Sequence, residues 1–174
     1  MINKILFLFT LNGYTRANFI RKKKLFKDIG DNIFFQPRKL PDDPHLIRFH
    51  NNISVASGVT FICHDVLHKV FNNIEPGSTT FHRGCIEVMD NVFIGANSII
   101  LHNVRIGSNV VIAAGSIVTK DIPDGSVVGG IPAKVVGSFD DLFEKRKLTR
   151  EITVGKSKSK VTEELWKDFI DSRS

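Results

Sequence analysis

Residues 88–123 read VMDNVFIGANSIILHNVRIGSNVVIAAGSIVTKDIP, and this stretch decides the fold. It repeats with a period of six residues. An aliphatic residue opens each hexad, a small or aliphatic residue follows four positions later, and asparagine, aspartate, serine or glycine fills the corners. The opening residues are Val88, Ile94, Ile100, Ile106, Ile112 and Val118. The second positions are Val92, Ser98, Val104, Val110, Ser116 and Ile122.

The six-residue period excludes the two simplest structures. A helix with 3.6 residues per turn cannot hold a six-residue stripe on one side, because the stripe drifts around the helix axis. A long straight strand is also excluded, because the glycine and asparagine corners recur too often. A short strand and a tight corner in each hexad fit both facts. Three such sides close a triangular coil of eighteen residues, and coils stacked about 4.8 Å apart pair their backbones.

The same pattern continues upstream, with one interruption. Phe49, Val55 and Phe61 stand at opening positions, and residues 29–35 form one earlier hexad. Phe61 and Val88 are 27 positions apart, which is not a multiple of six, so a loop must leave the coil within residues 63–83. We therefore expect a helical cap at 1–28, with its helix over 12–28, a coil domain at 29–137 and a helical tail at 138–174 with a polar linker at 154–160.

Composition limits the partners. The chain has 174 residues and a formal charge of +6, with much of the excess in basic runs at 21–24 and 145–160. Neither run carries interleaved aromatic residues, so both are interpreted as solvated faces and no nucleic-acid partner is expected. The apolar segment 5–9 is too short to span a bilayer, so stable membrane insertion is not expected. Two cysteines without a Cys-x-x-Cys spacing indicate reduced thiols in a cytoplasmic protein.

Three segments carry a resemblance to a known family: DNVFIGAN at 90–97, IAAGSIVTKDIP at 112–123 and GGIPAK at 129–134. Together they resemble the hexapeptide-repeat acyltransferases, a group that includes sugar O-acetyltransferases. The resemblance implies an all-β fold, a left-handed parallel β-helix, flanked here by helices. It implies transfer of an acetyl group from acetyl-CoA to a hydroxyl or amino group of a small acceptor, with a saccharide expected. It further implies a homotrimer whose active sites lie between chains, and no metal.

The resemblance also implies a catalytic base. In this family the catalytic histidine lies where the excursion loop leaves the coil, and here that position is His64. A hydroxyl group is a poor nucleophile toward a thioester, and a positioned imidazole that accepts its proton contributes about 10² to 10⁴ in rate. Asp65 could orient the imidazole, although an ordinary exposed carboxylate fits equally well. His68 and His82 lie in the same loop and are candidate acceptor contacts, with solvent-facing side chains as the alternative.

Five residues match family positions that bind the donor. Ala96 and Ala114 match small residues that leave room for the pantetheine arm, although a tight corner alone would also require small residues. Thr119 and Lys120 match donor contacts after the last coil, and Lys134 matches a basic residue that meets the nucleotide phosphates. Some relatives carry a further basic residue three positions later, where this chain has Gly137. That departure puts the tightness of 3′-phosphate binding in doubt, not the class of reaction.

Two other functions remain open from sequence. A trimeric zinc hydratase of the same fold would use His64 and His68 as ligands, with His82 as a third, but their spacing does not match that family. A non-catalytic repeat module would leave the coil intact and give His64 no role. His50 and His102 stand at coil corners, where structural roles are expected, and Cys63 and Cys85 are interpreted as unreactive thiols.

Overall fold

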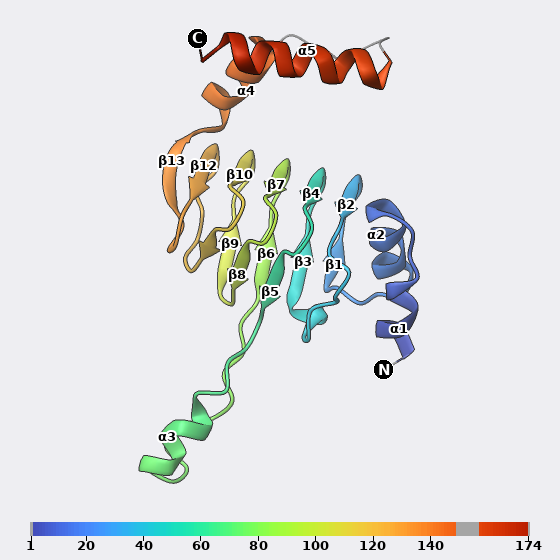
Figure 1. The fold of residues 1–174 in the computed structure, drawn as a ribbon. Coiled ribbons are helices and arrows are strands. Elements are labelled where there is room, and N and C mark those ends of the chain that lie inside the picture. The colour runs from blue at the N-terminus through green and yellow to red at the C-terminus, as the bar shows by residue number, and fades with distance from the viewer. Residues whose placement is uncertain (1, 149–156, 174) are drawn as a thin grey trace. The chain divides into compact units, whose positions relative to one another are not determined.

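A computed structural model describes residues 2–148 and 157–173 (Figure 1). The chain divides into two compact units, Met1–Asp140 and Asp141–Ser174. The first unit is a three-sided coil of short strands with helices at its N-terminal end. Its helices are α1 (Ile2–Leu8), α2 (Gly13–Lys22) and α3 (His68–Ile74), together with the 3₁₀ turn η1 (Pro44–Leu46).

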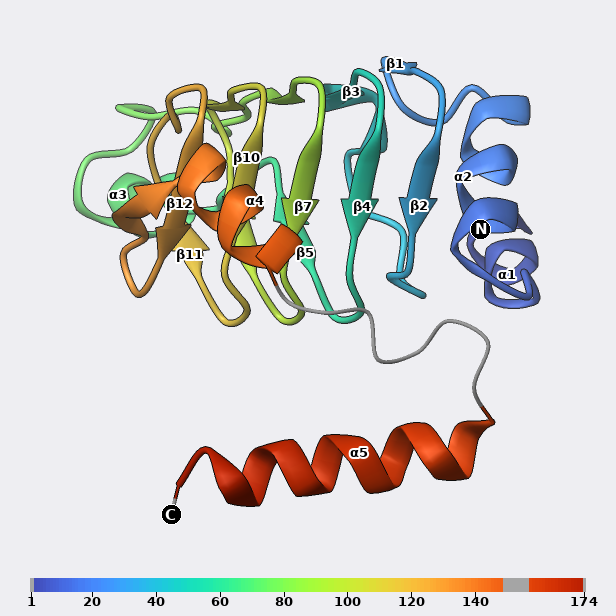
Figure 2. The same ribbon diagram turned by 90° about the horizontal axis from the view of Figure 1, so that it is seen from above.

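The strands form three sheets, one on each side of the coil, and the coil is the predicted left-handed β-helix. Figure 2 shows β2, β4, β7 and β10 side by side along one of these sides. One sheet has the order β1-β3-β6-β9, formed by Asp28–Ile29, Ile47–Phe49, Ile86–Val88 and Val104–Ile106. A second has the order β13-β12-β10-β7-β4-β2, formed by Lys134–Ser138, Ser126–Gly129, Val110–Ile112, Val92–Ile94, Ile53–Val55 and Ile33–Phe35. The third has the order β11-β8-β5, formed by Ile117–Val118, Ile99–Leu101 and Thr60–Ile62.

The pairing register of the strands shows how many residues each coil contains. Val92 pairs with Val110, so one regular coil takes the expected eighteen residues. Thr60 pairs with Ile99, a separation of 39 residues, because the excursion loop with α3 is inserted between them. Ile33 pairs with Ile53, a separation of 20 residues, so the first coil is also longer than eighteen. Its third side is the irregular segment 36–46 with η1 instead of a strand.

The inside of the coil is filled by the predicted hexad residues. Ile94, Ile100 and Ile106 are fully buried, as the repeat requires. Full burial of such a side chain contributes about 1.5 to 3 kcal/mol. Ser98 and Ser116, at second positions, are also fully buried, and both hydroxyl groups donate to the carbonyl of Ala113, at 3.1 Å and 2.6 Å. The upstream coils use phenylalanine in the same role: Phe35, Phe49 and Phe61 pack ring against ring.

Asparagine holds the corners. The corner residues adopt a left-handed backbone with φ between 54° and 59°, a conformation that asparagine tolerates better than most residues: Asn32, Asn52, Asn91, Asn97, Asn103 and Asn109. Four of them also form a ladder of side-chain hydrogen bonds from coil to coil, in which Asn32, Asn52, Asn91 and Asn109 are joined at 2.9–3.1 Å. The corners predicted from sequence therefore close the coils and tie them together.

The two ends of the coil are closed differently. At the N-terminal end, α1 and α2 lie beside β2 (Figure 1), and Phe7 and Ile20 are fully buried there. The helix predicted over 12–28 ends earlier, at Lys22, because the chain turns through a left-handed residue at Lys24 before β1. At the C-terminal end, β13 pairs antiparallel with β12, which the hexad pattern did not predict.

Two further helices complete the chain, α4 (Phe139–Leu148) and α5 (Lys158–Asp171). Of the predicted polar linker at 154–160, residues 154–156 lie outside the described residues, and α5 begins with Ser157 as its N-cap. Trp166 and Phe169 of α5 pack edge to face, with ring centroids 5.5 Å apart. Within the described parts of the chain, no helix has the length and apolar character needed to cross a bilayer.

Candidate functional site

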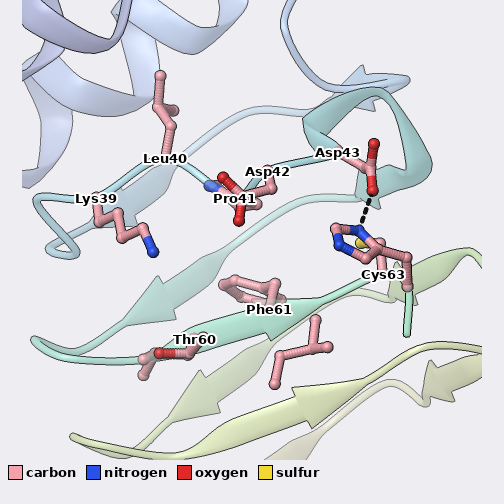
Figure 3. Close-up of a pocket in the computed structure, with 11 residues that line it drawn as sticks. Lys39, Leu40, Pro41, Asp42, Asp43, Thr60, Phe61 and Cys63 are labelled. Carbon is pink, nitrogen blue, oxygen red and sulfur yellow. Dashed lines mark hydrogen bonds and ion pairs between the residues drawn. The ribbon is translucent and has the colours of Figure 1, made fainter. Parts of the chain in front are cut away.

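A pocket of about 270 Å³ lies between the irregular segment 36–46 and strand β5 (Figure 3). Its walls combine the apolar inner side of the coil with polar side chains from the irregular segment. Because 36–46 has no strand partner on this side, its backbone stands away from β5 and leaves the space. The lining residues are Lys39, Leu40, Pro41, Asp42, Asp43, Val59, Thr60, Phe61, Ile62, Cys63 and His64.

A histidine and a carboxylate meet at one end of this pocket. Nδ1 of His64 lies 2.5 Å from Oδ2 of Asp43, the contact drawn as a dashed line in Figure 3. An ionised carboxylate can only accept a hydrogen bond, so Nδ1 carries the hydrogen and donates it. Nε2 of His64 is then left with a free lone pair, which is the state a general base needs. The two side chains keep 31% and 15% of their surface exposed, so substrate can reach the imidazole.

Asp43 is a candidate functional residue that the sequence pattern missed. It directly precedes η1 and makes no capping hydrogen bond to that turn, which leaves its carboxylate for His64. No hexad includes it, since it lies in the one coil side that is not a strand. The available signal was the pair of extra residues in the first coil, together with the run Pro41-Asp42-Asp43-Pro44, which is poor in strand formers.

The predicted orienting role of Asp65 is not what the structure contains. One oxygen of Asp65 accepts the backbone N–H of Leu67 at 3.0 Å, and the other lies 3.6 Å from Nε2 of His102. This local turn holds the carboxylate toward His102, so Asp43 takes the place at the imidazole of His64. The same contact gives His102 a partner at its coil corner, where a structural role was predicted.

The remaining loop residues divide into two groups. The ring of Phe81 packs against His64 at a centroid distance of 5.1 Å and against His68 at 5.4 Å, and the guanidinium of Arg83 lies over the same ring. His64 and His68 therefore share one aromatic neighbour, the ring of Phe81. His82 lies apart from this group and packs against His102, with ring centroids 4.8 Å apart.

The thiol beside the candidate base is not a nucleophile. Cys63 is buried, and this burial raises the pKa of its thiol to about 11, with the Asp43 carboxylate and Cys85 acting in the same direction. At neutral pH the group is therefore a neutral thiol, and only a thiolate is an effective nucleophile. A covalent acyl-cysteine step has no support in this geometry, and the remaining base is His64.

The residues predicted to bind the donor lie around one face of the coil, the sheet β11-β8-β5. Ala96 and Ala114 stand one above the other at the corner that enters this sheet, where the Gly115 N–H donates to the Ala96 carbonyl at 2.8 Å. Thr119 and Lys120 follow β11 at the opposite corner, the corner at which His64 follows β5. The face therefore has small residues along one edge and the candidate base along the other.

The residues predicted to bind the donor leave this face open. A side-chain carbon added at Gly115 would meet no atom within 4 Å, and Thr119, Lys120 and Lys134 are exposed. Lys134 begins β13, and the turn before it is tied to β11 because the Ala133 N–H donates to the Ile117 carbonyl at 2.8 Å. The open corner at Gly115 and the exposure of both lysines leave the predicted donor residues accessible to a ligand. No zinc-type set is formed by His64, His68 and His82 within the described part of one chain.

Comparisons with known proteins agree with this architecture. Residues 86–120 match the family model described as bacterial transferase hexapeptide (six repeats). Protein CapG of Staphylococcus aureus is 44% identical over 120 residues, which cover 67% of this chain and 69% of CapG. A tetrahydropyridine-dicarboxylate N-acetyltransferase of Kosmotoga olearia is 49% identical over 80 residues, but these cover 45% of this chain and only 33% of that enzyme.

Solved structures extend the comparison to most of the chain. A maltose O-acetyltransferase of Clostridium difficile 630 superposes with a TM-score of 0.61 at 26% identity, covering 79% of this chain and 82% of that one. A hexapeptide-repeat acetyltransferase of Vibrio cholerae, solved with acetyl coenzyme A, superposes with a TM-score of 0.58 at 23% identity, covering 79% and 84%. The second similarity establishes the shared fold alone.

Proposed function

The chain belongs to the hexapeptide-repeat acetyltransferase family, and from that premise we propose that it transfers an acetyl group from acetyl-CoA to a hydroxyl group of a saccharide. The observation that carries the proposal is the hydrogen-bonded pair of His64 and Asp43 at the end of a polar pocket. Transfer to a hydroxyl group requires a base beside the acceptor, and His64 lines this pocket.

The proposed reaction uses His64 twice. Nε2 takes the proton of the acceptor hydroxyl as that oxygen attacks the thioester carbonyl, which gives a tetrahedral oxyanion. When this intermediate collapses, the C–S bond breaks and the imidazolium returns the proton to the departing CoA sulfur. Asp43 keeps the imidazole in the correct tautomer and stabilises the imidazolium between the two steps. The acetyl ester and free CoA are the products, and no acyl-enzyme forms.

The pocket suits a hydroxyl-rich acceptor. Lys39, Asp42 and Thr60 supply donors and acceptors of hydrogen bonds, and Phe61 adds an apolar side. Saccharides present the same combination, hydroxyl groups around a ring with apolar C–H faces. The maltose enzyme, which aligns over 82% of its length, acts on a saccharide according to its name. We place a hydroxyl acceptor before an amine because the N-acetyltransferase relative aligns over only a third of its length.

The donor site is proposed along the face β11-β8-β5. The pantetheine arm would pass over the corner formed by Ala96 and Ala114. Thr119 and Lys120, at the opposite corner of the face, would contact the donor, and Lys120 and Lys134 would meet its phosphates. A convex face encloses little of a ligand, so we propose that a second chain completes the donor site in a homotrimer. His64 of one chain then faces the donor held against its neighbour. We further propose that the enzyme acts in the cytoplasm, where acetyl-CoA is made, on units of a surface polysaccharide.

The deciding experiment is a thiol-release assay with acetyl-CoA and a panel of acceptors, including maltose, galactosides, amino sugars and simple alcohols. Wild type, His64→Ala and the control His45→Ala are compared; His45 is an exposed histidine of η1 that does not line the pocket. We expect His64→Ala to lose about 10² to 10⁴ in kcat with at least one saccharide, and His45→Ala to retain wild-type turnover. Equal release of CoA by wild type and His64→Ala would remove the base assignment. Turnover with amine acceptors alone would rule out a saccharide hydroxyl group as the acceptor.

A further inference from the structure

The base of the excursion loop is held together by its own backbone hydrogen bonds. The strand that leaves the coil and the strand that returns pair antiparallel at His64 and Arg83. The Asp65 N–H donates to the His82 carbonyl at 3.2 Å, and the Gly84 N–H donates to the Cys63 carbonyl at 2.8 Å. The two segments therefore run side by side out to α3, as Figure 1 shows. This pairing fixes the backbone of Asp65 next to that of His82.

The coil corner after β8 brings a third side chain to the same place. His102 directs Nε2 to the carboxylate of Asp65, at 3.6 Å, and its ring packs against His82. The side chains of Asp65, His82 and His102 each offer a ligand atom, and these atoms all lie within 4.8 Å of one another. Among the residues that the structure describes, this is the one group of three histidine, cysteine or acidic side chains that comes so close together.

The backbone around the group leaves little freedom. A side-chain carbon at Gly84 would lie 2.2 Å from Oδ1 of Asn103, so the returning strand and the corner that carries His102 are in direct contact. Oδ1 of Asp65 accepts the Leu67 N–H, which leaves Oδ2 as the oxygen that faces the histidines. Nδ1 of His102 is buried and has no hydrogen-bond partner, so Nε2 is the nitrogen available to a ligand. Three separate segments thus present one atom each.

One separation in this group is close to the spacing of ligand atoms around a small metal ion. Zinc binds histidine nitrogen and carboxylate oxygen at about 2.0 to 2.2 Å in tetrahedral geometry, which places neighbouring ligand atoms about 3.3 to 3.5 Å apart. The Asp65–His102 separation of 3.6 Å is within a few tenths of an ångström of that value. A simple ion pair of these two residues gives no role to His82, whose contact with Asn103 is at 3.5 Å, the outer limit for a hydrogen bond.

We propose that Asp65, His82 and His102 bind one divalent transition-metal ion of the zinc class, with water or another ligand in the fourth position. The ion joins the outgoing strand, the returning strand and the coil corner, and so clamps the base of the loop that begins at His64. The site is separate from acetyl transfer, because Asp43 holds the imidazole of His64 without help from these three side chains. The proposal therefore stands or falls independently of the acetyltransferase mechanism.

The test uses the full-length chain without a histidine tag, freed of metal with a chelator and titrated with Co²⁺. A tetrahedral site gives strong visible absorption bands, and we expect about one Co²⁺ per chain, displaced by Zn²⁺. Loss of even an outer partner of a metal ligand costs about 10- to 100-fold in affinity, so His82→Ala and His102→Ala should each weaken binding by at least about 100-fold. His45→Ala, which removes an exposed histidine elsewhere, should bind as wild type.

Thermal unfolding supplies a second readout. Zn²⁺ should raise the melting temperature of wild type and of His45→Ala, and should leave that of His82→Ala unchanged, because only a ligand that binds the folded state stabilises it. His82 is exposed, so its replacement leaves the coil intact, and His102→Asn serves where His102→Ala does not fold. Absence of Co²⁺ bands in wild type, or equal affinity in wild type, His82→Ala and His102→Asn, would overturn the proposal.

Discussion

The regular coils at 86–122 and the irregular segments at 36–46 and 63–85 differ in how strictly they keep the hexad. In the regular coils every sixth residue is buried, and each strand pairs with one eighteen residues away. The irregular segments break that count, and they carry Asp43, His64, His82 and Phe81, whose ring packs against His64. The buried positions of the repeat hold the scaffold, and the candidate base and its carboxylate lie where the chain departs from the repeat. Four changes test this division, and they follow in order of decreasing effect.

Ile106→Ala tests the scaffold side of the comparison. Ile106 is fully buried at an opening position, and truncating a buried isoleucine to alanine typically costs about 2 to 5 kcal/mol. Chemical denaturation should show that loss in the free energy of unfolding, while kcat of the remaining folded protein stays near wild type. Phe93→Ala, an outward and half-exposed position of the same coils, is the control and should cost less than about 1 kcal/mol. An equal loss of unfolding free energy in both variants would contradict the assignment of the hexad-opening residues to the inside of the coil.

Asp43→Asn tests the candidate catalytic pair, which lies in the irregular segments. An asparagine amide can donate to Nδ1 of His64, which favours the tautomer with hydrogen on Nε2 and removes the base. We expect kcat to fall by about 10² and the pH dependence of kcat to change, with the free energy of unfolding within about 0.5 kcal/mol of wild type. Asp65→Asn is the matched variant, and it should leave the pH dependence intact. An effect of Asp65→Asn equal to that of Asp43→Asn would return the orienting role to Asp65.

Lys134→Ala addresses the donor face, where the coil ends in the hairpin of β12 and β13. An exposed lysine that meets a phosphate contributes about 1 kcal/mol, which corresponds to about fivefold in binding. We expect the Michaelis constant for acetyl-CoA to rise by about that factor, while kcat changes by less than about twofold. Lys22→Ala, an exposed lysine of α2, is the control. A fall in kcat without a change in the donor constant would remove Lys134 from the phosphate site.

Glu87→Gln tests how the stability of the regular coils depends on pH. Hydrogen bonds from His50, and then from Arg105 and Arg48, lower the pKa of the Glu87 carboxyl below its ordinary value. A group whose pKa is lower in the folded protein stabilises that state above its unfolded pKa, and this contribution is lost as pH falls through the folded pKa. Wild type should therefore lose more stability than Glu87→Gln on acidification below about pH 4.5. Because both arginines are largely exposed, the difference in stability between the two proteins should be small. An equal loss of stability in both proteins on acidification would contradict the prediction.

The sequence predicted the family, the left-handed coil and the class of enzyme, and all three are confirmed. Donor residues, the homotrimer and the saccharide remain proposals. The excursion was located from a count alone, because 27 residues cannot be divided into hexads. The early end of α2 and the antiparallel β13 escaped prediction, since each depends on one local turn, at Lys24 and at 130–133, rather than on a repeat.

The sequence by itself determined the scaffold, because burial of one aliphatic residue in every six can be satisfied by very few backbones. It also determined that His64 stands at the start of the loop. Only the tertiary structure decided which carboxylate meets that histidine. Asp43 is 21 residues from His64 and Asp65 is its neighbour in sequence, yet a turn at Leu67 directs Asp65 away while the longer first coil brings Asp43 to 2.5 Å. Side-chain direction in irregular segments depends on packing between coils, and no periodicity in the sequence encodes it.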